Sequence, residues 1–115
     1  MRLATLLALT IAALLPQPAL AATCKLTPKQ VVTKFMTRFY IEKDVRGAFE
    51  TWVDPDYIQH NPMAATGRDA AIGFLEPFFK ANPGIKYEIK RVIADGNLVA
   101  VHAWGRFNDA DRGMA

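Results

Sequence analysis

Apolar residues recur at helical spacing in three stretches of the chain. Over about residues 28–43, positions three and four apart form one apolar stripe, made by Val31, Val32, Phe35, Met36, Phe39 and Tyr40. Such a stripe indicates an amphipathic helix with one buried face. At its start, Thr27 can accept from free backbone N–H groups, and Pro28 fits the first turn. The pattern therefore predicts a helix over about residues 28–43.

Two further helices are predicted. The second is short, begins after the capping residue Asp44 and ends before Pro55, because proline disfavours helix at the residue before it. The third begins near Arg68, and its apolar stripe consists of Ala71, Phe74, Leu75, Phe78 and Phe79. Pro77 lies inside that stripe and removes one backbone donor, so we expect a kink or a tightened last turn before Asn82.

The period changes from helical to alternating after Gly84. Residues 85–94 and 98–107 are predicted strands, joined by the turn signal Asp95-Gly96-Asn97. If Gly96 and Asn97 are the two turn residues, the facing pairs are Ile93 with Ala100, Arg91 with His102, Ile89 with Trp104 and Tyr87 with Arg106. A hairpin that is apolar on both faces must cover both. We expect the helices to cover one face and a second copy of the chain to cover the other, as a homodimer.

The first 21 residues have the pattern of a secretory signal peptide. Arg2 supplies a positive charge, an apolar run extends from Leu3 to Leu15, and Ala19-Leu20-Ala21 provides small residues for cleavage. We therefore expect a domain over residues 22–115, secreted or located in a bacterial periplasm, with no membrane association after cleavage. Cys24 is the only cysteine, which excludes an internal disulfide and leaves a free thiol or a lipidated N-terminus as alternatives.

Composition narrows the classes of partner and reaction. The chain has 14 Lys and Arg against 11 Asp and Glu, and Arg2 belongs to the leader, so the domain is only mildly basic. Its basic residues are spread along the chain, and we expect no nucleic acid partner. His60 and His102 have no cysteine near them in sequence, so we expect no metal site. The sequence contains no serine, which excludes a serine nucleophile.

A polar segment crosses between the second and third predicted helices. Its residues are Tyr57, Ile58, Gln59, His60, Asn61 and Pro62. In an extended segment, alternation places Tyr57 and Gln59 on one side and Ile58 and His60 on the other. The segment suits the wall of a pocket, and it equally suits an ordinary loop in which the His60-Asn61 pair caps a helix or makes a turn. For His102 the alternative is a strand histidine paired with Arg91 or Glu88.

The order of these elements resembles a known family. Gln59-His60-Asn61-Pro62, then Gly67-Arg68-Asp69 at a helix start, then the D-G-x-x-V-x-V-H pattern of residues 95–102 are similar to the SnoaL-like (polyketide cyclase-like) branch of the nuclear transport factor 2-like superfamily. The resemblance extends from about Thr27 to Ala115. It implies an α+β fold in which a cone-shaped, curved antiparallel sheet packs on three helices and encloses one apolar pocket. Many relatives dimerise through the convex face of the sheet.

The resemblance also implies a class of chemistry. Some relatives are polyketide cyclases that perform an aldol condensation without a cofactor, and others are isomerases, dehydratases or non-catalytic binding domains. The acid/base aspartate of the cyclases lies on a late strand, which would begin near Met114 here. We therefore expect the sequence to be truncated at its C-terminus, with the last strands and that aspartate missing.

The remaining residues suggest a cofactor-free site for a small hydrophobic carbonyl compound. Aldol or isomerase-type chemistry needs a base next to the carbonyl and donors for the enolate oxygen. His60 and His102 are the candidate catalytic residues, because imidazole titrates near neutral pH. The candidate substrate-binding residues are Tyr57, Gln59, Asn61, Trp104 and Phe35. Trp104 has a core or dimer contact as its alternative, and the whole domain has non-catalytic ligand binding as its alternative.

Overall fold

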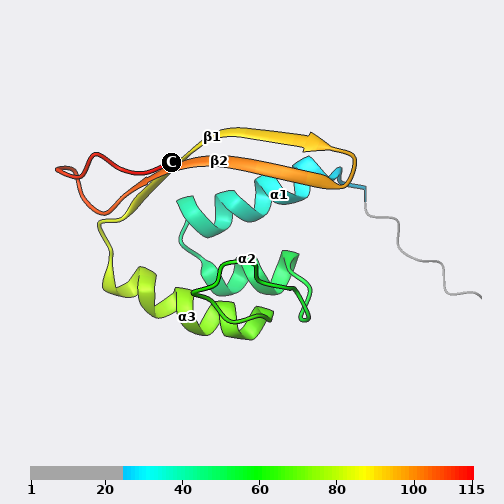
Figure 1. Ribbon diagram of the computed structural model, residues 1–115, viewed down its shortest axis with the longest axis horizontal. Coiled ribbons are helices and arrows are strands. Elements are labelled where there is room, and N and C mark those ends of the chain that lie inside the picture. Colours follow the sequence, from blue (N-terminus) through cyan, green and yellow to red (C-terminus); the bar gives the residue numbers. More distant parts are fainter. Residues whose placement is uncertain (1–24) are drawn as a thin grey trace, which may run out of the picture.

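The computed structural model describes residues 25–115 as an α+β arrangement of three helices and one antiparallel hairpin, which confirms the predicted fold class. The elements are α1 (Pro28–Met36), the π-helix η1 (Thr37–Ile41), α2 (Val45–Trp52), α3 (Arg68–Ala81), β1 (Lys86–Asp95) and β2 (Leu98–Arg106). The hairpin lies against α1, and α2 and α3 lie on the other side of α1 (Figure 1). The predicted signal peptide and Cys24 fall outside the described residues.

The first helix begins as predicted but changes its winding near the end. Thr27 Oγ1 accepts from the N–H of Gln30, and the Gln30 side chain accepts from the N–H of Thr27 at 2.8 Å, so the two residues form a capping box. The chain then widens into the π-helix η1, in which one turn holds more residues than an α turn. There the consecutive rings of Phe39 and Tyr40 stack with centroids 4.4 Å apart.

The second and third helices have the predicted boundaries. Asp44 caps α2, because its carboxylate accepts from the N–H of Gly47 at 3.0 Å. Helix α3 runs from Arg68 to Ala81 with Pro77 inside it. At its end, the N–H of Asn82 reaches carbonyls both three and four residues back, which is the tightened last turn that the sequence suggested. Within residues 25–115, no helix is long and apolar enough to cross a membrane.

The hairpin has the predicted register only near its turn. From Asp95–Leu98 to Arg91–His102, the facing pairs are those expected. A β-bulge at Lys90 then shifts the pairing by one residue, so Ile89 faces Ala103 and Tyr87 faces Gly105. The predicted pairs of Ile89 with Trp104 and of Tyr87 with Arg106 are therefore wrong.

The bulge has a physical reason in the burial of β1. Ile89 and Val92 are three positions apart, so regular alternation would place them on opposite faces. Both are half-buried, because the extra residue Lys90 restores them to the face that meets the helices. Tyr87 lies on the same face, with its ring stacked 4.2 Å from that of Tyr40.

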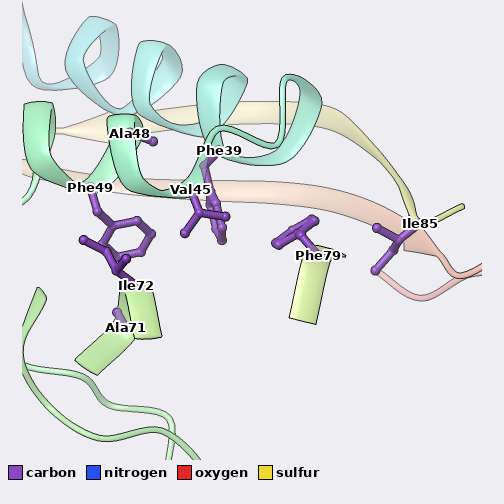
Figure 2. Packing of buried hydrophobic residues seen from close by; sticks show 8 residues of the cluster. All are labelled: Phe39, Val45, Ala48, Phe49, Ala71, Ile72, Phe79 and Ile85. Atoms are coloured by element: carbon purple, nitrogen blue, oxygen red, sulfur yellow. The ribbon is translucent and has the colours of Figure 1, made fainter. Parts of the chain in front are cut away.

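The buried core is formed by η1, α2, α3 and the residue that directly precedes β1. It consists of Phe39, Val45, Ala48, Phe49, Ala71, Ile72, Phe79 and Ile85. Figure 2 shows Phe49 of α2 directed toward Ile72 and Ala71 of α3, with Phe79 and Ile85 farther along the same core. Beyond the hairpin, Met114 forms a bridge to Gly105 through two hydrogen bonds of 2.8 Å, as expected for the start of a further strand.

Candidate functional site

An apolar pocket of about 410 Å³ lies between α1, η1, α2, α3 and the polar segment that contains Tyr57. It is lined by Phe35, Phe39, Tyr40, Phe49, Val53, Tyr57, Gln59, Asn61 and Leu75. Four of the five predicted substrate-binding residues are therefore brought together: Phe35, Tyr57, Gln59 and Asn61. The pocket volume is within the roughly 300–1,000 Å³ that small-molecule sites usually have.

Aromatic rings form the wall of this pocket on the helix side. Phe35 meets Phe49 edge to face with centroids 5.1 Å apart, and Phe39 meets Phe49 in the same way at 5.4 Å. The ring of Tyr57 approaches Phe49 from the polar segment at 6.3 Å. Edge-to-face contacts of this kind fix the relative positions of the rings. The wall is thus held in shape by residues that are themselves part of the buried core.

A hydrogen-bond chain holds the polar side of the pocket. The backbone N–H of Asn61 donates to Gln59 Oε1 at 2.9 Å, and Gln59 Nε2 donates to Tyr57 Oη at 2.5 Å. Because both ends of the Gln59 amide are engaged, its orientation is fixed. The Tyr57 oxygen acts as an acceptor in this chain, so its own hydrogen is free to donate to a bound molecule.

Asn61 makes a turn and also lies at the pocket. Its Oδ1 accepts from the N–H of Met63 at 2.9 Å, which makes a tight turn after the polar segment. The same residue lines the pocket. Gln59 makes a further hydrogen bond, in which its backbone N–H donates to Thr66 Oγ1 at 3.3 Å. The segment is therefore an extended crossing tied at several points, without a strand of its own.

Burial sets the protonation state of the pocket phenols. Desolvation raises the pKa of Tyr57, and the hydrogen bond from Gln59 offsets part of that rise. Desolvation also raises the pKa of Tyr40, and the nearby Tyr87 raises it further. Both hydroxyls are consequently neutral donors at physiological pH. Among the described residues that line the pocket, Tyr40 and Tyr57 are the titratable ones.

The two histidines do not lie in this pocket. His60 is exposed on the side of the polar segment opposite Gln59, together with Ile58, which is 66% exposed. His102 is exposed on the hairpin face that points away from the helices, and its Nδ1 lies 3.5 Å from Arg91 Nη1. The structure does not place them on facing walls of one cavity. Their catalytic role stays a prediction, and the pocket geometry gives it no support.

Trp104 lies on the same outward face as His102 and also outside the pocket. Its ring is flanked by Lys90 Nζ at 5.7 Å and by the Arg106 guanidinium at 5.3 Å. Its Nε1 donates to the carbonyl of Arg112 at 3.2 Å. Trp104 therefore belongs neither to the pocket nor to the buried core, and the dimer contact that the sequence suggested for it stays a prediction.

Sequence reasoning missed five lining residues. They are Phe39, Tyr40, Phe49, Val53 and Leu75. All lie in or next to the apolar helical stripes, where a pocket wall and a packed core have the same periodicity. The useful signal was the four-residue spacing from Phe35 to Phe39 and from Phe49 to Val53, which places each pair on one helix face.

Within residues 25–115, no group of three or more His, Cys, Asp or Glu is placed to hold a metal ion. Among models of known protein families, one described as SnoaL-like domain matches residues 32–115. The match covers more than two thirds of the chain and includes every pocket residue. No curated protein sequence matches the chain.

Proposed function

The chain belongs to the family of SnoaL-like domains, and on that premise we propose that its pocket binds one small apolar molecule that carries a carbonyl oxygen. The observation that carries the proposal is the Tyr57 hydroxyl, held by Gln59 at the edge of an aromatic pocket of about 410 Å³. The rings supply apolar area for a hydrocarbon body, worth roughly 25 cal/mol per Å² buried. The hydroxyl supplies one directed donor for an acceptor.

Binding is favoured over acid/base turnover by the protonation of the lining. A base that abstracts a proton next to a carbonyl must be unprotonated near pH 7. Within the described part of the lining, the titratable groups are Tyr40 and Tyr57, and burial raises the pKa of both. Neutral tyrosines donate hydrogen bonds and do not abstract protons at that pH.

Acid/base chemistry on the same ligand class is the second candidate. It is supported by the Tyr57 hydroxyl, which is a suitable donor for a developing enolate oxygen. It requires a base that the lining within residues 25–115 does not supply. Cofactor-free turnover of a ketone by the protein, measured as exchange of its α-protons with solvent deuterium, would favour this candidate over simple binding.

The binding proposal is tested with two matched probes. 2-Acetylnaphthalene has a carbonyl, and 2-isopropenylnaphthalene has nearly the same shape without it. Isothermal titration calorimetry should show that Tyr57→Phe lowers the affinity for the ketone about two- to tenfold, as expected for the loss of one neutral hydrogen bond. The hydrocarbon should bind Tyr57→Phe and the unaltered protein equally well. Equal losses for both probes would contradict the donor role of Tyr57.

Control variants separate the pocket from the outward face. Tyr87→Phe removes a hydroxyl from a ring outside the main pocket and should leave the ketone affinity unchanged. His60→Ala and His102→Ala should also leave it within about twofold, because both side chains are exposed and neither lines the pocket. If either histidine variant lowered the affinity for the ketone tenfold or more, that histidine would take part in binding.

Two further parts of the proposal concern the protein outside the pocket. Residues 1–21 support export to a periplasm or to the medium, which N-terminal sequencing of the mature protein tests directly. Ile93 is 62% exposed on the outward face of the hairpin, which supports a homodimer through that face. Sedimentation of the unaltered protein and of Ile93→Asp tests the dimer, since the charge should shift the population to monomer.

A further inference from the structure

A second, smaller cavity lies directly behind the main pocket. It has a volume of about 140 Å³ and lies under the hairpin, where Tyr87, Ala103, Gly105 and Phe107 contribute to its lining. Tyr40 is the one residue in the described part of the chain that lines both this cavity and the main pocket. The ring of Tyr40 therefore stands between the two spaces.

A continuous stack of rings holds Tyr40 in this position. The ring of Phe39 lies 4.4 Å from Tyr40 on one side, and the ring of Tyr87 lies 4.2 Å from it on the other. Tyr87 in turn lies against Gly105, where a Cβ atom would come within 2.6 Å of Tyr87 Cε1. The π-helix η1 contributes two consecutive rings, Phe39 and Tyr40, to this stack.

We propose that Tyr40 sets the maximum length of the ligand by closing the inner end of the main pocket. The inference rests on the proposed binding function and adds the residue that determines size selection. The space behind Tyr40 would enlarge the site by about a third. With Tyr40 in place, the site accepts compact apolar ketones and excludes those with a long apolar extension opposite the carbonyl.

The chemistry of the smaller cavity identifies the kind of extension that would fill it. Most of its lining is apolar, and Arg106 is the charged residue. The apolar lining residues include Ile85, Tyr87, Ala103, Phe107 and Met114. The Arg106 guanidinium is already paired with Asp109 at 2.9 Å and lies over Trp104 on the outward face. An alkyl chain, and not a charged group, is the extension that suits this space.

The test uses a series of 2-acetylnaphthalenes with a 6-alkyl group that lengthens from none to hexyl. In the unaltered protein, calorimetry should show affinity rising by up to about fourfold per methylene and then levelling off when the chain reaches Tyr40. In Tyr40→Ala, the rise should continue to longer chains, with a gain of roughly tenfold or more for the hexyl compound. Tyr40→Phe keeps the ring and should level off where the unaltered protein does.

A double variant shows whether the gain comes from the second cavity. Ala103→Leu fills that cavity from the hairpin side and should leave the unsubstituted ketone unaffected. Combined with Tyr40→Ala, it should abolish the gain for long chains. Tyr40→Trp provides an opposite change that keeps an aromatic stack, and it should shorten the longest chain accepted.

The outcomes distinguish this inference from the binding proposal. If the parent ketone binds but affinity levels off at the same chain length in Tyr40→Ala, Tyr40→Trp and the unaltered protein, the size-selecting role is wrong and the binding function stands. If the parent ketone fails to bind the unaltered protein, both fail. If Tyr40→Ala does not fold, as judged by circular dichroism, the comparison of Tyr40→Trp with Tyr40→Phe decides the question alone.

Discussion

The polar segment and the strand β2 both carry candidate residues, and the fold uses them differently. In the polar segment, Tyr57 and Gln59 turn toward the helices and line the pocket. In β2, His102 and Trp104 turn away from the helices, and Ala103 between them faces inward. Residue chemistry was equally suggestive in the two places, and the face of the backbone decided which side chains reach the pocket.

The contrast extends to the means by which each region is held. The pocket side is packed, with edge-to-face rings and a side-chain amide fixed at both ends. The outward face of the hairpin is held by exposed ion pairs, such as Lys90 with Glu88 and Lys86 with Asp109. Packed rings stabilise by burial, whereas exposed ion pairs contribute about 0–1 kcal/mol each. The proposed recognition of an apolar molecule accordingly depends on the first region.

The largest expected difference between the regions is in stability. Phe49→Ala removes a ring that is 5% exposed and contacts Phe35, Phe39 and Tyr57, so we expect a loss of about 3–5 kcal/mol in the free energy of unfolding. In dilute solution, where the protein is monomeric, Ile93→Ala on the outward face should change it by less than about 0.5 kcal/mol. Urea unfolding followed by circular dichroism measures both.

A different result for Ile93 would be informative. If Ile93→Ala also lost several kcal/mol and the loss depended on protein concentration, the outward face would be buried in solution by a second copy. The outward face would then be exposed in one protomer but packed in the dimer.

A smaller loss in the free energy of unfolding is expected at Gly105, where the hairpin packs against the aromatic rings behind it. Gly105→Ala would place a Cβ 2.6 Å from Tyr87 Cε1, so the ring must move away from β2. We expect a loss of about 1–3 kcal/mol, as for other overpacked sites, with a change in near-UV circular dichroism from the tyrosine stack. Gly73→Ala is the matched control, because a Cβ there meets no atom within 4 Å and alanine favours the interior of α3 by roughly 0.5–1 kcal/mol. Equal effects of the two changes would show that Tyr87 does not rest on Gly105.

Much of the fold followed from sequence because its signals were local. The Asp44 cap, the start of α3 at Arg68 and the turn at Gly96 each depend on residues only a few positions apart. The bulge at Lys90 did not follow, since it depends on both Ile89 and Val92 facing helices that are distant in sequence. That one-residue shift is also why the predicted partners of Trp104 and Arg106 were wrong.

The candidate site was predicted in part for a similar reason. Alternation in the polar segment separated Tyr57 and Gln59 from His60, as the structure has them, but His60 was still predicted to be catalytic although Gln59 lines the pocket from the opposite side of the segment. For His102, both faces of the hairpin were apolar enough in sequence to be the face that meets the helices. The contacts of Tyr87 with Tyr40 and Phe79 identify the inner face, and His102 lies on the other one. Pocket residues within the helical stripes have no sequence signal that separates them from the core.

The smallest expected effect compares two carboxylates, one in each region, as the pH is lowered. The backbone bond from Gly47 holds the pKa of Asp44 below its usual range, and the bond from Arg38 adds to this. On the outward side, the bond from Lys86 lowers the pKa of Asp109, with the charges of Lys86 and Arg106 adding to the effect. A carboxyl with a lowered folded-state pKa stabilises the fold above its unfolded pKa of about 4, and this contribution is lost as pH falls through the folded value.

Asp44→Asn and Asp109→Asn should therefore each make unfolding less sensitive to acid below about pH 4. Both groups are solvent-exposed, so screening keeps both effects small. Asp44 should matter more, because its carboxylate also accepts from a backbone N–H at the start of α2, whereas Asp109 only pairs with the exposed Lys86 and the half-buried Arg106 side chains. Thermal unfolding midpoints measured from pH 6 to pH 2 in low and high salt separate the two cases: added salt should abolish the Asp109 difference and leave most of the Asp44 difference. The reverse order would mean that the ion pairs of the outward face, and not the capping of the helices behind the pocket, govern stability in acid.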